Sequence, residues 1–501
     1  MKSILKYISL LALVLVLTTS CEDFLDVNTD PNNPTSVTPD LVLPVAQKYT
    51  AELIQRDRYI SHLGNMMMYN WSQSDGFSWY NEEFLYQVNS SFYQQIFNVS
   101  YQNALKQYQI LDNLEGADYD YYRAIAKVMK AYHFQLLVDF YGDVPYTEAL
   151  QRSQEATPAY DDAADIYTDL IVQLDSAITL IKGAEASVIK PDENGDVMFA
   201  GNMTNWIQMA NTVKLRILVR QSDAADVSAQ IAAIEAEGTG FITSDVLVNP
   251  GYAVEEGKQN PLWNELGWDV GGTQTLSSKA TCATPYVLEH LFNTNDPRID
   301  YIYEVPENPN TDLGGHLGVV QGLDQYDSPV VDAYIPENVS NIGPGILKSG
   351  TMGANILSLA EVYFLRAEAA LKGLHTGDAQ TYYESGIEAS FAYLGAPGAG
   401  DYIGQSPEIA LVSWNVASTD EERLEYIITQ KWIAVNGITA EQSWFDYSRT
   451  GYPSGLPISL QASTPDRPVR LYYPASEISA NGENVPTQPD AFNDKMFWAG
   501  N

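Results

Sequence analysis

Apolar residues recur at helical spacing along much of this chain, and this periodicity is the strongest constraint on its fold. The cleanest case runs from Asp161 to Lys182 and ends at Gly183. Its apolar stripe consists of Ile166, Leu170, Leu174, Ile178 and Ile181. A stripe of this kind is stable only when it is buried against a neighbour, and successive amphipathic helices with short connections predict antiparallel helix pairs. The pattern therefore indicates a mostly α fold.

Similar patterns predict further helices on both sides of this segment. They lie at residues 38–70, 82–114, 119–140, 205–220, 223–237, 284–293, 355–372, 378–394 and 419–435. Ser418 and Glu421 have the spacing of a capping box at the start of the last of these helices. The final fifty residues, rich in proline and aromatic residues, are expected to form coil. Helix pairs indicate a tetratricopeptide-like scaffold, although no sequence repeat of about 34 residues is visible.

The helical pattern stops between residues 241 and 353, where Gly, Pro, Asn and Asp are frequent. Within this segment only 284–293 has a helical pattern. Ordering so long a segment costs conformational entropy without the hydrogen bonds of regular structure, so such insertions in compact domains are usually functional. We therefore expect residues 40–501 to form a single helical domain with an irregular, ligand-binding insertion at 241–353.

Residues 1–20 have the layout of a secretory signal peptide. Lys2 and Lys6 precede an apolar run from Ile8 to Leu17, which is too short to span a bilayer. Cys21 follows small polar residues, so we expect cleavage before Cys21, lipidation of Cys21 and a tether at residues 21–39. Thr18 occupies the position where a lipobox usually has leucine, and a plain secreted protein is the alternative.

The charge balance restricts the partners of this chain. It contains 64 Asp and Glu residues against 27 Lys and Arg, with a formal net charge of −37. Nucleic acids and anionic membrane surfaces are bound through Lys and Arg, so we expect no nucleic acid partner and membrane attachment through the lipid alone. Since only Cys282 remains once Cys21 is lipidated, no intramolecular disulfide is expected.

Residues for metal binding and catalysis form no convincing pattern. The five histidines lie far apart, and the chain has no phosphate-binding glycine loop and no nucleophile elbow. Asp192, Asn194 and Asp196 match the first three ligand positions of a calcium loop, but Val197 replaces the turn glycine and Met203 replaces the bidentate glutamate. An acidic surface loop is the preferred interpretation, with structural calcium as the weaker one. We expect no other cofactor and no enzyme activity. A glycoside hydrolase, which needs only two carboxylates, stays open.

Aromatic residues in irregular segments are the best candidates for ligand binding. Trp71 and Trp79 lie among turn-forming and polar residues, and Trp263 and Trp268 lie in a similar stretch. Such rings can stack on the apolar faces of a sugar while neighbouring amides bond its hydroxyls. The alternative is that they fill gaps beneath long loops. The predicted ligand-binding residues are Trp71, Trp79, Tyr80, Trp263, Trp268, Tyr301 and Tyr303. Trp206, Trp432 and Trp444 lie in or beside helical patterns and are expected in the core.

Motifs spread over nearly the whole chain resemble the SusD/RagB-like family of nutrient-binding outer-membrane lipoproteins. They are CEDFLDVNTDPNNP at 21–34, FYGDVPY at 140–146, LAEVYFLRAEA at 359–369, QKWIA at 430–434, WFDYSRTGYP at 444–453 and RLYYP at 470–474. The resemblance implies a helical fold with tetratricopeptide-like pairs, a lipid-anchored position at the cell surface of the outer membrane, and glycan binding beside a TonB-dependent, SusC-like transporter.

The residues within these motifs mostly indicate structural roles. Arg449 and Arg470, for example, are expected to pair with carboxylates. The family's ligand contacts come from variable loops, so the resemblance identifies no binding residue. The predicted function is a non-catalytic lipoprotein that binds an oligosaccharide, or a peptide, and delivers it to the transporter. A structural lid on the transporter without its own nutrient site is the second alternative.

Overall fold

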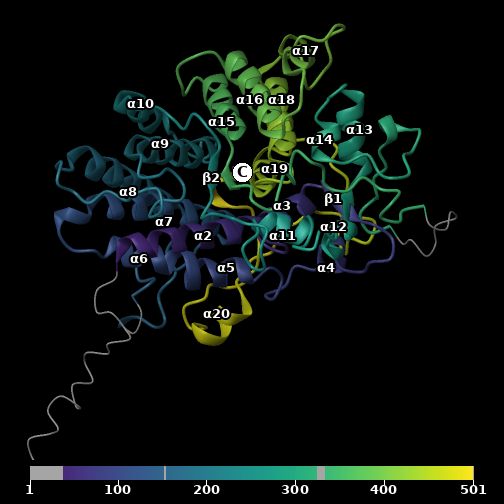
Figure 1. The fold of residues 1–501 in the computed structure, drawn as a ribbon. Helices are drawn as coiled ribbons and strands as arrows, with labels where there is room; N and C mark the ends of the chain where they lie inside the picture. Colours follow the sequence, from purple (N-terminus) through teal and green to yellow (C-terminus); the bar gives the residue numbers. More distant parts are fainter. Residues whose placement is uncertain (1–37, 152–153, 324–332, 500–501) are drawn as a thin grey trace, which may run out of the picture.

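The computed structural model describes residues 38–151, 154–323 and 333–499 (Figure 1). The predicted signal peptide, the tether and Cys21 lie outside the described residues. Across these three ranges, no helix combines the length and apolar character needed to cross a membrane. The mostly α fold is confirmed, with short strands that only connect segments of the chain.

Successive helices pack side by side on the left of Figure 1. They are α6 (Lys106–Asp112), α7 (Asp120–Tyr141), α8 (Ala163–Gly183), α9 (Met203–Arg220) and α10 (Ser228–Glu237), with α2 (Pro39–Gln55) packed on α6. The Asp162 side chain caps α8 by accepting hydrogen bonds from the next two free N–H groups, of Ala164 and Asp165. All five residues of the α8 stripe are buried, which confirms the prediction for this helix.

A second group of helices lies at the top of Figure 1. It comprises α15 (Leu359–Leu371), α16 (Ala379–Leu394), α17 (Ala399–Ile403) and α18 (Asp420–Val435), with α19 (Glu441–Thr450) below them. Helix α19 was not predicted, because most of its polar residues are buried together with its apolar ones. Gly64 allows α19 to approach α3 (Ile60–Met67) closely, since a Cβ there would lie 2.1 Å from the Glu441 nitrogen.

Two long predicted helices are interrupted. The one expected at 38–70 divides into α2 and α3 and ends before strand β1 (Trp71–Gln73). The one expected at 82–114 divides into α4 (Asn81–Leu85), α5 (Gln95–Val99), the π-helix η1 (Ser100–Leu105) and α6. Arg58, Tyr86 and Tyr93 adopt positive φ angles of 57°, 50° and 51° at these breaks. A right-handed helix cannot continue through such residues, and apolar periodicity does not reveal them.

The insertion at 241–353 is more regular than expected. The predicted helix at 284–293 is confirmed as α13 (Pro285–Asn293), and three further short helices are present: α11 (Pro261–Leu266), α12 (Leu276–Ala280) and α14 (Ile299–Ile302). Strand β3 (Thr281–Ala283) pairs antiparallel with β1, and β2 (Val246–Val248) pairs with β4 (Ala354–Leu357). The β2–β4 pairing brings the two ends of the insertion together, and the β1–β3 pairing ties its middle to the segment that follows α3.

The C-terminal segment is coil with one short helix, α20 (Ala475–Ala480). The remaining helical turns are the 3-10 helices η2 (Ala117–Tyr119), η4 (Leu313–Gly315), η6 (Trp414–Val416) and η7 (Phe497–Ala499). Trp206, Trp432 and Trp444 are buried in the core, as predicted. The core is therefore shared by the helical scaffold and the insertion, whose residues belong to the same buried cluster.

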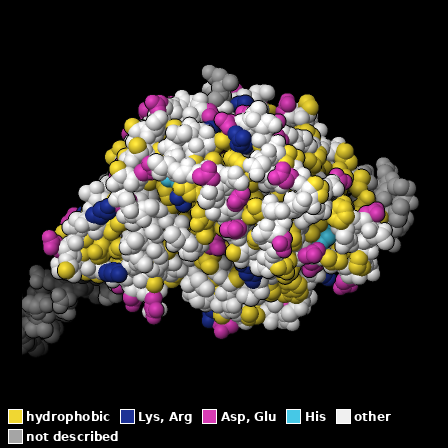
Figure 2. All heavy atoms as spheres, turned by 90° about the horizontal axis from the view of Figure 1, so that it is seen from above, with side chains coloured by type: hydrophobic (Ala, Val, Ile, Leu, Met, Phe, Trp, Pro, Cys, Tyr) yellow, Lys and Arg dark blue, Asp and Glu magenta, His cyan; other side chains and the backbone are white. Residues whose placement is uncertain are grey.

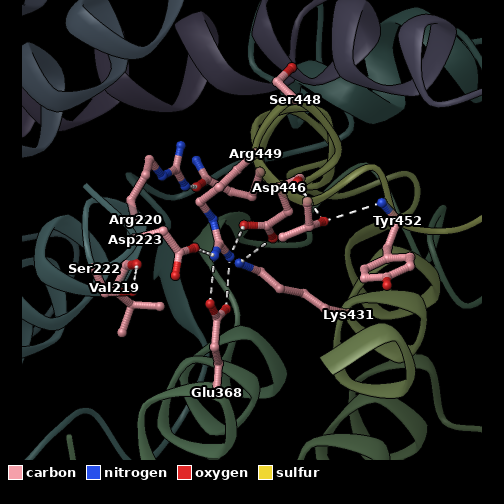
Figure 3. A network of polar contacts seen from close by, with 12 residues as sticks. Val219, Arg220, Ser222, Asp223, Glu368, Lys431, Asp446, Ser448, Arg449 and Tyr452 are labelled. Carbon is pink, nitrogen blue, oxygen red and sulfur yellow. Dashed lines mark hydrogen bonds and ion pairs between the residues drawn. The ribbon is translucent and has the colours of Figure 1, made fainter. Parts of the chain in front are cut away.

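A buried network of charges joins the two groups of helices (Figure 3). The Arg449 guanidinium donates two hydrogen bonds to the Glu368 carboxylate, at 2.6 and 2.8 Å, and also pairs with Asp223 at 3.0 Å. Lys431 pairs with Asp446 at 2.8 Å beside them. The network connects α15, α18 and α19 with the turn after α9, so the predicted carboxylate partner of Arg449 is confirmed.

The prediction for Arg470 is wrong. Within the described residues its guanidinium forms no ion pair and instead donates to the Tyr141 carbonyl oxygen. Gly142, with φ of 80°, leaves room for this contact, since a Cβ there would lie 2.9 Å from the Arg470 guanidinium. Arg470 therefore closes the C-terminal end of α7 by binding a free carbonyl group.

Further buried ion pairs extend this arrangement. Arg216 of α9 pairs with Glu361 of α15 at 2.9 Å, and Arg220 of α9 pairs with Asp139 of α7 at 2.7 Å. The insertion is held in the same way, because Arg298 pairs with Asp296 at 2.6 Å and donates to Gln430 of α18 at 2.7 Å.

The Glu368→Gln substitution tests the network. It removes one charge from a buried pair and leaves Arg449 incompletely neutralised, so we expect a loss of about 3–5 kcal/mol in the free energy of unfolding at neutral pH. Urea unfolding measures this loss. The exposed Glu388→Gln on α16 is the matched control, with an expected change within about 0.5 kcal/mol. Equal losses in the two variants would contradict a special role for Glu368.

The same pair predicts a pH dependence. Burial alone would raise the pKa of Glu368, but Arg449 and Lys372 outweigh it and lower this pKa from 4.5 to about 2. A lowered pKa in the folded state stabilises the fold above pH 4.5, and this stabilisation is lost as the pH falls from 4.5 towards 2. The free energy of unfolding should therefore fall less steeply with decreasing pH in Glu368→Gln than in the parent protein. An unchanged acid profile would show that Glu368 titrates normally.

The capping box of α18 lies one residue later than predicted. The Thr419 hydroxyl accepts from the Glu422 nitrogen at 3.2 Å, and the Glu422 carboxylate accepts from the Thr419 nitrogen at 3.1 Å. Thr419→Ala should lower the free energy of unfolding by about 1 kcal/mol, and Ser418→Ala should cost less than half of that. Thermal unfolding of the two variants compares them directly. A larger loss in Ser418→Ala than in Thr419→Ala would instead indicate that Ser418 and Glu421 form the capping box.

Candidate functional site

Strand β1 and the part of the insertion that contains α12, α13 and α14 lie on the right of Figure 1. Strands β1 and β3 pair with Trp71 opposite Ala283 and Gln73 opposite Thr281. Beyond the strands, the Ser74 hydroxyl donates to the Lys279 carbonyl oxygen at 2.7 Å. The two aromatic segments singled out in the sequence therefore belong to the same part of the molecule.

Three of the predicted ligand-binding residues, Trp71, Tyr80 and Tyr303, are buried in the structure. Their exposed fractions are 1%, 0% and 0%. Trp71 and Tyr80 pack on His62, with ring centroids at 5.6 and 5.0 Å. Tyr303 donates to the Asn70 carbonyl oxygen at 3.0 Å. These rings fill space beneath the loops and present no face to a ligand.

The other four predicted residues, Trp79, Trp263, Trp268 and Tyr301, are partly exposed. Trp79 lies edge to face with Phe77, with centroids 5.0 Å apart. Tyr301 belongs to α14, which Figure 1 shows apart from α11 and its tryptophan. The structure therefore brings Trp263 and Trp268 together, and Tyr301 lies elsewhere in the insertion.

Trp263 and Trp268 form a pair of rings at the surface, with centroids 4.9 Å apart and planes inclined by 38°. The Asn260 side chain fixes the start of α11 by accepting from the Trp263 nitrogen at 3.0 Å. The Gln259 amide donates to the Trp268 carbonyl oxygen at 3.1 Å. Gly267 is required beneath the pair, because a Cβ there would lie 2.8 Å from the Trp263 ring. The pair is therefore held rigidly in place before any ligand arrives.

A cavity of about 310 Å³ lies between α2, α11 and residues 250–259, and α11 contributes Pro261, Asn264 and Glu265 to its wall rather than Trp263. Four of its charged residues are paired with one another, Lys48 with Glu52 at 2.6 Å and Arg56 with Glu265 at 3.9 Å, and Lys258 pairs with the neighbouring Glu255 at 2.6 Å. Tyr252 also lines it, and burial raises the pKa of this tyrosine. The cavity thus offers hydrogen-bonding groups of both kinds with little net charge, which suits a neutral polar ligand.

A second cavity of about 200 Å³ is formed partly by residues 72–78. The Gln73 side chain shapes this loop, since its carbonyl oxygen accepts from the Trp79 nitrogen at 2.6 Å and its amide donates to the Phe77 carbonyl oxygen at 2.6 Å. Phe77, which lines this cavity, was missed in the sequence although it lies in the same aromatic segment as Trp79.

The turn 56–59 lies between the two aromatic segments. The Arg58 guanidinium donates to the Trp79 carbonyl oxygen, while Arg56 faces Glu265 of α11. Sequence reasoning missed both arginines because it placed them inside a continuous helix. A signal was present, since the successive residues Arg56, Asp57 and Arg58 interrupt the apolar pattern.

The loop that resembled a calcium site is structural. Asp196 is buried, and its carboxylate accepts from the Gln47 amide and the Trp206 indole, both at 2.8 Å, and from the Gly201 nitrogen at 2.9 Å. N–H donors occupy the oxygens that a calcium ion would need. Among the described residues, no group of three or more His, Cys, Asp or Glu side chains is arranged to hold a metal ion. The loop is therefore not simply an acidic surface loop, because it joins α2 to α9.

Acidic side chains are scattered over the upper face of the molecule, among hydrophobic ones and isolated Lys and Arg residues (Figure 2). On the face shown, the basic side chains do not gather into an area that could follow a phosphate backbone. The partly exposed aromatic rings, rather than charge, are thus the distinctive chemistry of the candidate site.

Comparison with solved structures supports the fold. A chitin-binding SusD homologue from Flavobacterium johnsoniae is 23% identical, with a TM-score of 0.73 over 92% of this chain and 99% of that chain. A protein described as chitin-binding is 25% identical, with a TM-score of 0.74 over 93% and 100%. A SusD homologue from Bacteroides thetaiotaomicron is 22% identical, with a TM-score of 0.72 over 93% and 99%. No curated protein sequence matches the chain.

Residues 31–474 match a SusD-like family described as starch-binding and associating with the outer membrane. The match covers most of the chain, including the scaffold, the insertion and the motifs at 140–146, 359–369 and 444–453. Together with the shared fold, it shows that this chain belongs to the SusD-like family of outer-membrane-associated proteins.

Proposed function

We propose that this protein is a non-catalytic, lipid-anchored receptor that binds an oligosaccharide and delivers it to a TonB-dependent, SusC-like transporter. The single observation that carries the glycan site is the partly exposed pair of Trp263 and Trp268 at α11, the helix that also forms one wall of a polar cavity of about 310 Å³. Planar rings bind the C–H faces of a sugar, and the paired polar groups of the cavity bind its hydroxyls. The family description and the chitin-binding relatives support a carbohydrate ligand.

Trp79 and Phe77 form the second part of the proposed ligand surface. The turn 56–59 contacts both their segment and α11, so it connects the two aromatic groups. A chain-like ligand could then contact the Trp263 pair and the Trp79 segment at the same time. Tyr301 stays a separate candidate contact on α14.

Replacing Trp263 or Trp268 by alanine should weaken glycan binding. Loss of one stacking ring is expected to cost about 1–2 kcal/mol, which is about a 5- to 30-fold increase in Kd. Isothermal titration with the hexamer of N-acetylglucosamine and with maltoheptaose measures this change, with Trp79→Ala as a third variant. Release of new reducing ends in the same mixtures would instead indicate a glycoside hydrolase.

Trp414→Ala is the matched control for these substitutions. Trp414 is also partly exposed, but it packs on Tyr383 at 5.2 Å in the separate core of α16 and α18. Its loss should leave glycan affinity unchanged. If Trp263→Ala, Trp268→Ala and Trp79→Ala all retain the parent affinity, the proposed site is wrong. If the parent protein binds no glycan or peptide but retains the transporter in a pull-down, the protein is a structural lid.

Lipid anchoring through Cys21 is tested in cells. Cys21→Ser removes the acceptor of the acyl chains, so the protein should move from the membrane fraction to the soluble fraction. Fractionation and immunoblotting give the readout, and Cys282→Ser is the control, because Cys282 is buried in the fold. Retention of the Cys21→Ser protein in the membrane would contradict anchoring at this residue.

A further inference from the structure

Three cavities join into one groove along α5, η1, α6 and α7. Their volumes are about 780, 310 and 210 Å³, and Leu150 lines all three. Tyr101 lines the first and third, while Gln109 and Gln151 line the first and second. We call this feature the helix groove. Its widest section is larger than the cavities beside Trp263 and Trp79, of about 310 and 200 Å³.

The helix groove lies apart from the proposed site on the insertion. Figure 1 shows α6 and α7 to the left of α11, and no residue that lines these three cavities lines the cavity between α2 and α11. The groove is bounded by these scaffold helices and by residues 145–151, none of which belongs to the insertion. A ligand in the groove would therefore occupy a second, separate site.

A row of aromatic rings runs along the helix groove. Phe97 and Tyr101 have centroids 4.8 Å apart, Tyr101 and Phe134 6.0 Å, and Phe134 and Tyr146 4.7 Å. Phe97 and Phe134 are buried, whereas Tyr101 and Tyr146 remain partly exposed. Both tyrosine hydroxyls are fixed, Tyr101 donating to the Pro145 carbonyl oxygen at 2.6 Å and Tyr146 to Asp169 at 2.5 Å. Rings held in this way lose little conformational freedom when a ligand stacks on them.

Two unusual backbone segments meet at the helix groove. Tyr101 belongs to the π-helix η1, a form that is rare in proteins and frequent at functional sites. Leu150 has φ of 67°, a left-handed conformation that is uncommon for leucine. The π-helix and the left-handed Leu150 both lie at this groove, and unusual backbone conformations of this kind cluster at binding sites.

The chemistry of the helix groove favours a neutral, hydroxyl-rich ligand. Amide side chains of Gln109 and Gln151 line the same cavities as the tyrosine rings. Lys127 and Lys130 both pair with Asp112, at 3.5 and 2.7 Å, and Asp169 lines the same cavity. Lys106 lines the widest cavity and Glu477 the smallest, so charges of the two signs nearly balance along the groove. A peptide that binds by adding a strand to a sheet would need an unpaired strand edge. The described walls of this groove are helices and an irregular segment with polar side chains. We infer that the helix groove is a second binding site, specific for a neutral oligosaccharide.

Hydrogen exchange tests this inference independently of the site on the insertion. The purified protein carrying Trp79→Ala, Trp263→Ala and Trp268→Ala is mixed with millimolar N-acetylglucosamine hexamer, with maltoheptaose, or with a neutral unstructured peptide. We expect at least one of the sugars to slow exchange in residues 97–113 and 145–151. Because the three tryptophans are absent, this result holds whether or not the proposed function of the Trp263 pair is correct.

Substitutions at the rim then locate the contact. Gln109→Ala combined with Gln151→Ala removes partly exposed amides without opening the core, and should raise the sugar concentration needed for protection about tenfold. Gln380→Ala on α16 is the control and should change nothing. Absence of protection by both sugars, protection by the peptide alone, or protection unaffected by the double substitution would each overturn the inference.

Discussion

The bidentate ion pair between Arg449 and Glu368 is the interaction on which the arrangement of the C-terminal helices depends. Both side chains lie inside the protein, where an unpaired charge costs several kcal/mol. The pair therefore requires α19 and α15 to lie next to each other. The buried pair of Lys431 and Asp446 requires the same of α18 and α19. Asp223 also pairs with Arg449 and so joins the turn after α9 to α19. The buried charges therefore determine which helices are neighbours and also stabilise their packing.

The buried charges also explain why the family can be recognised although sequence identity to its solved members is only 20–25%. Glu361, Glu368, Gln430, Asp446 and Arg449 all belong to the motifs that carry the resemblance. Each of them contacts a side chain from another element of the scaffold or, for Gln430, from the insertion. The motifs thus describe how the scaffold is assembled, whereas the aromatic residues proposed to bind ligand lie outside them.

The sequence predicts the helices best where burial follows a simple stripe, as in α8, and worst where the backbone turns at residues with positive φ, such as Arg58 and Tyr93. It also missed α19, whose polar residues are buried in the charge network instead of facing solvent. The sequence shows which irregular segments are rich in aromatic residues, but it does not show which of their rings are buried. Trp71 packs on His62 in the core, whereas Trp263 lies at the surface. That difference depends on the pairing of β1 with β3, a contact between residues more than two hundred positions apart in the chain.

The central claim is that the scaffold holds a preformed aromatic surface on the insertion, with Trp263 and Trp268 as its binding rings. A crystal structure of the purified protein with bound N-acetylglucosamine hexamer or maltoheptaose tests it most directly. The account predicts a sugar ring stacked on Trp263 or Trp268, with Trp71, Tyr80 and Tyr303 still buried. Sugar density against any of these three buried rings, or on the insertion but away from the Trp263 pair, would contradict it.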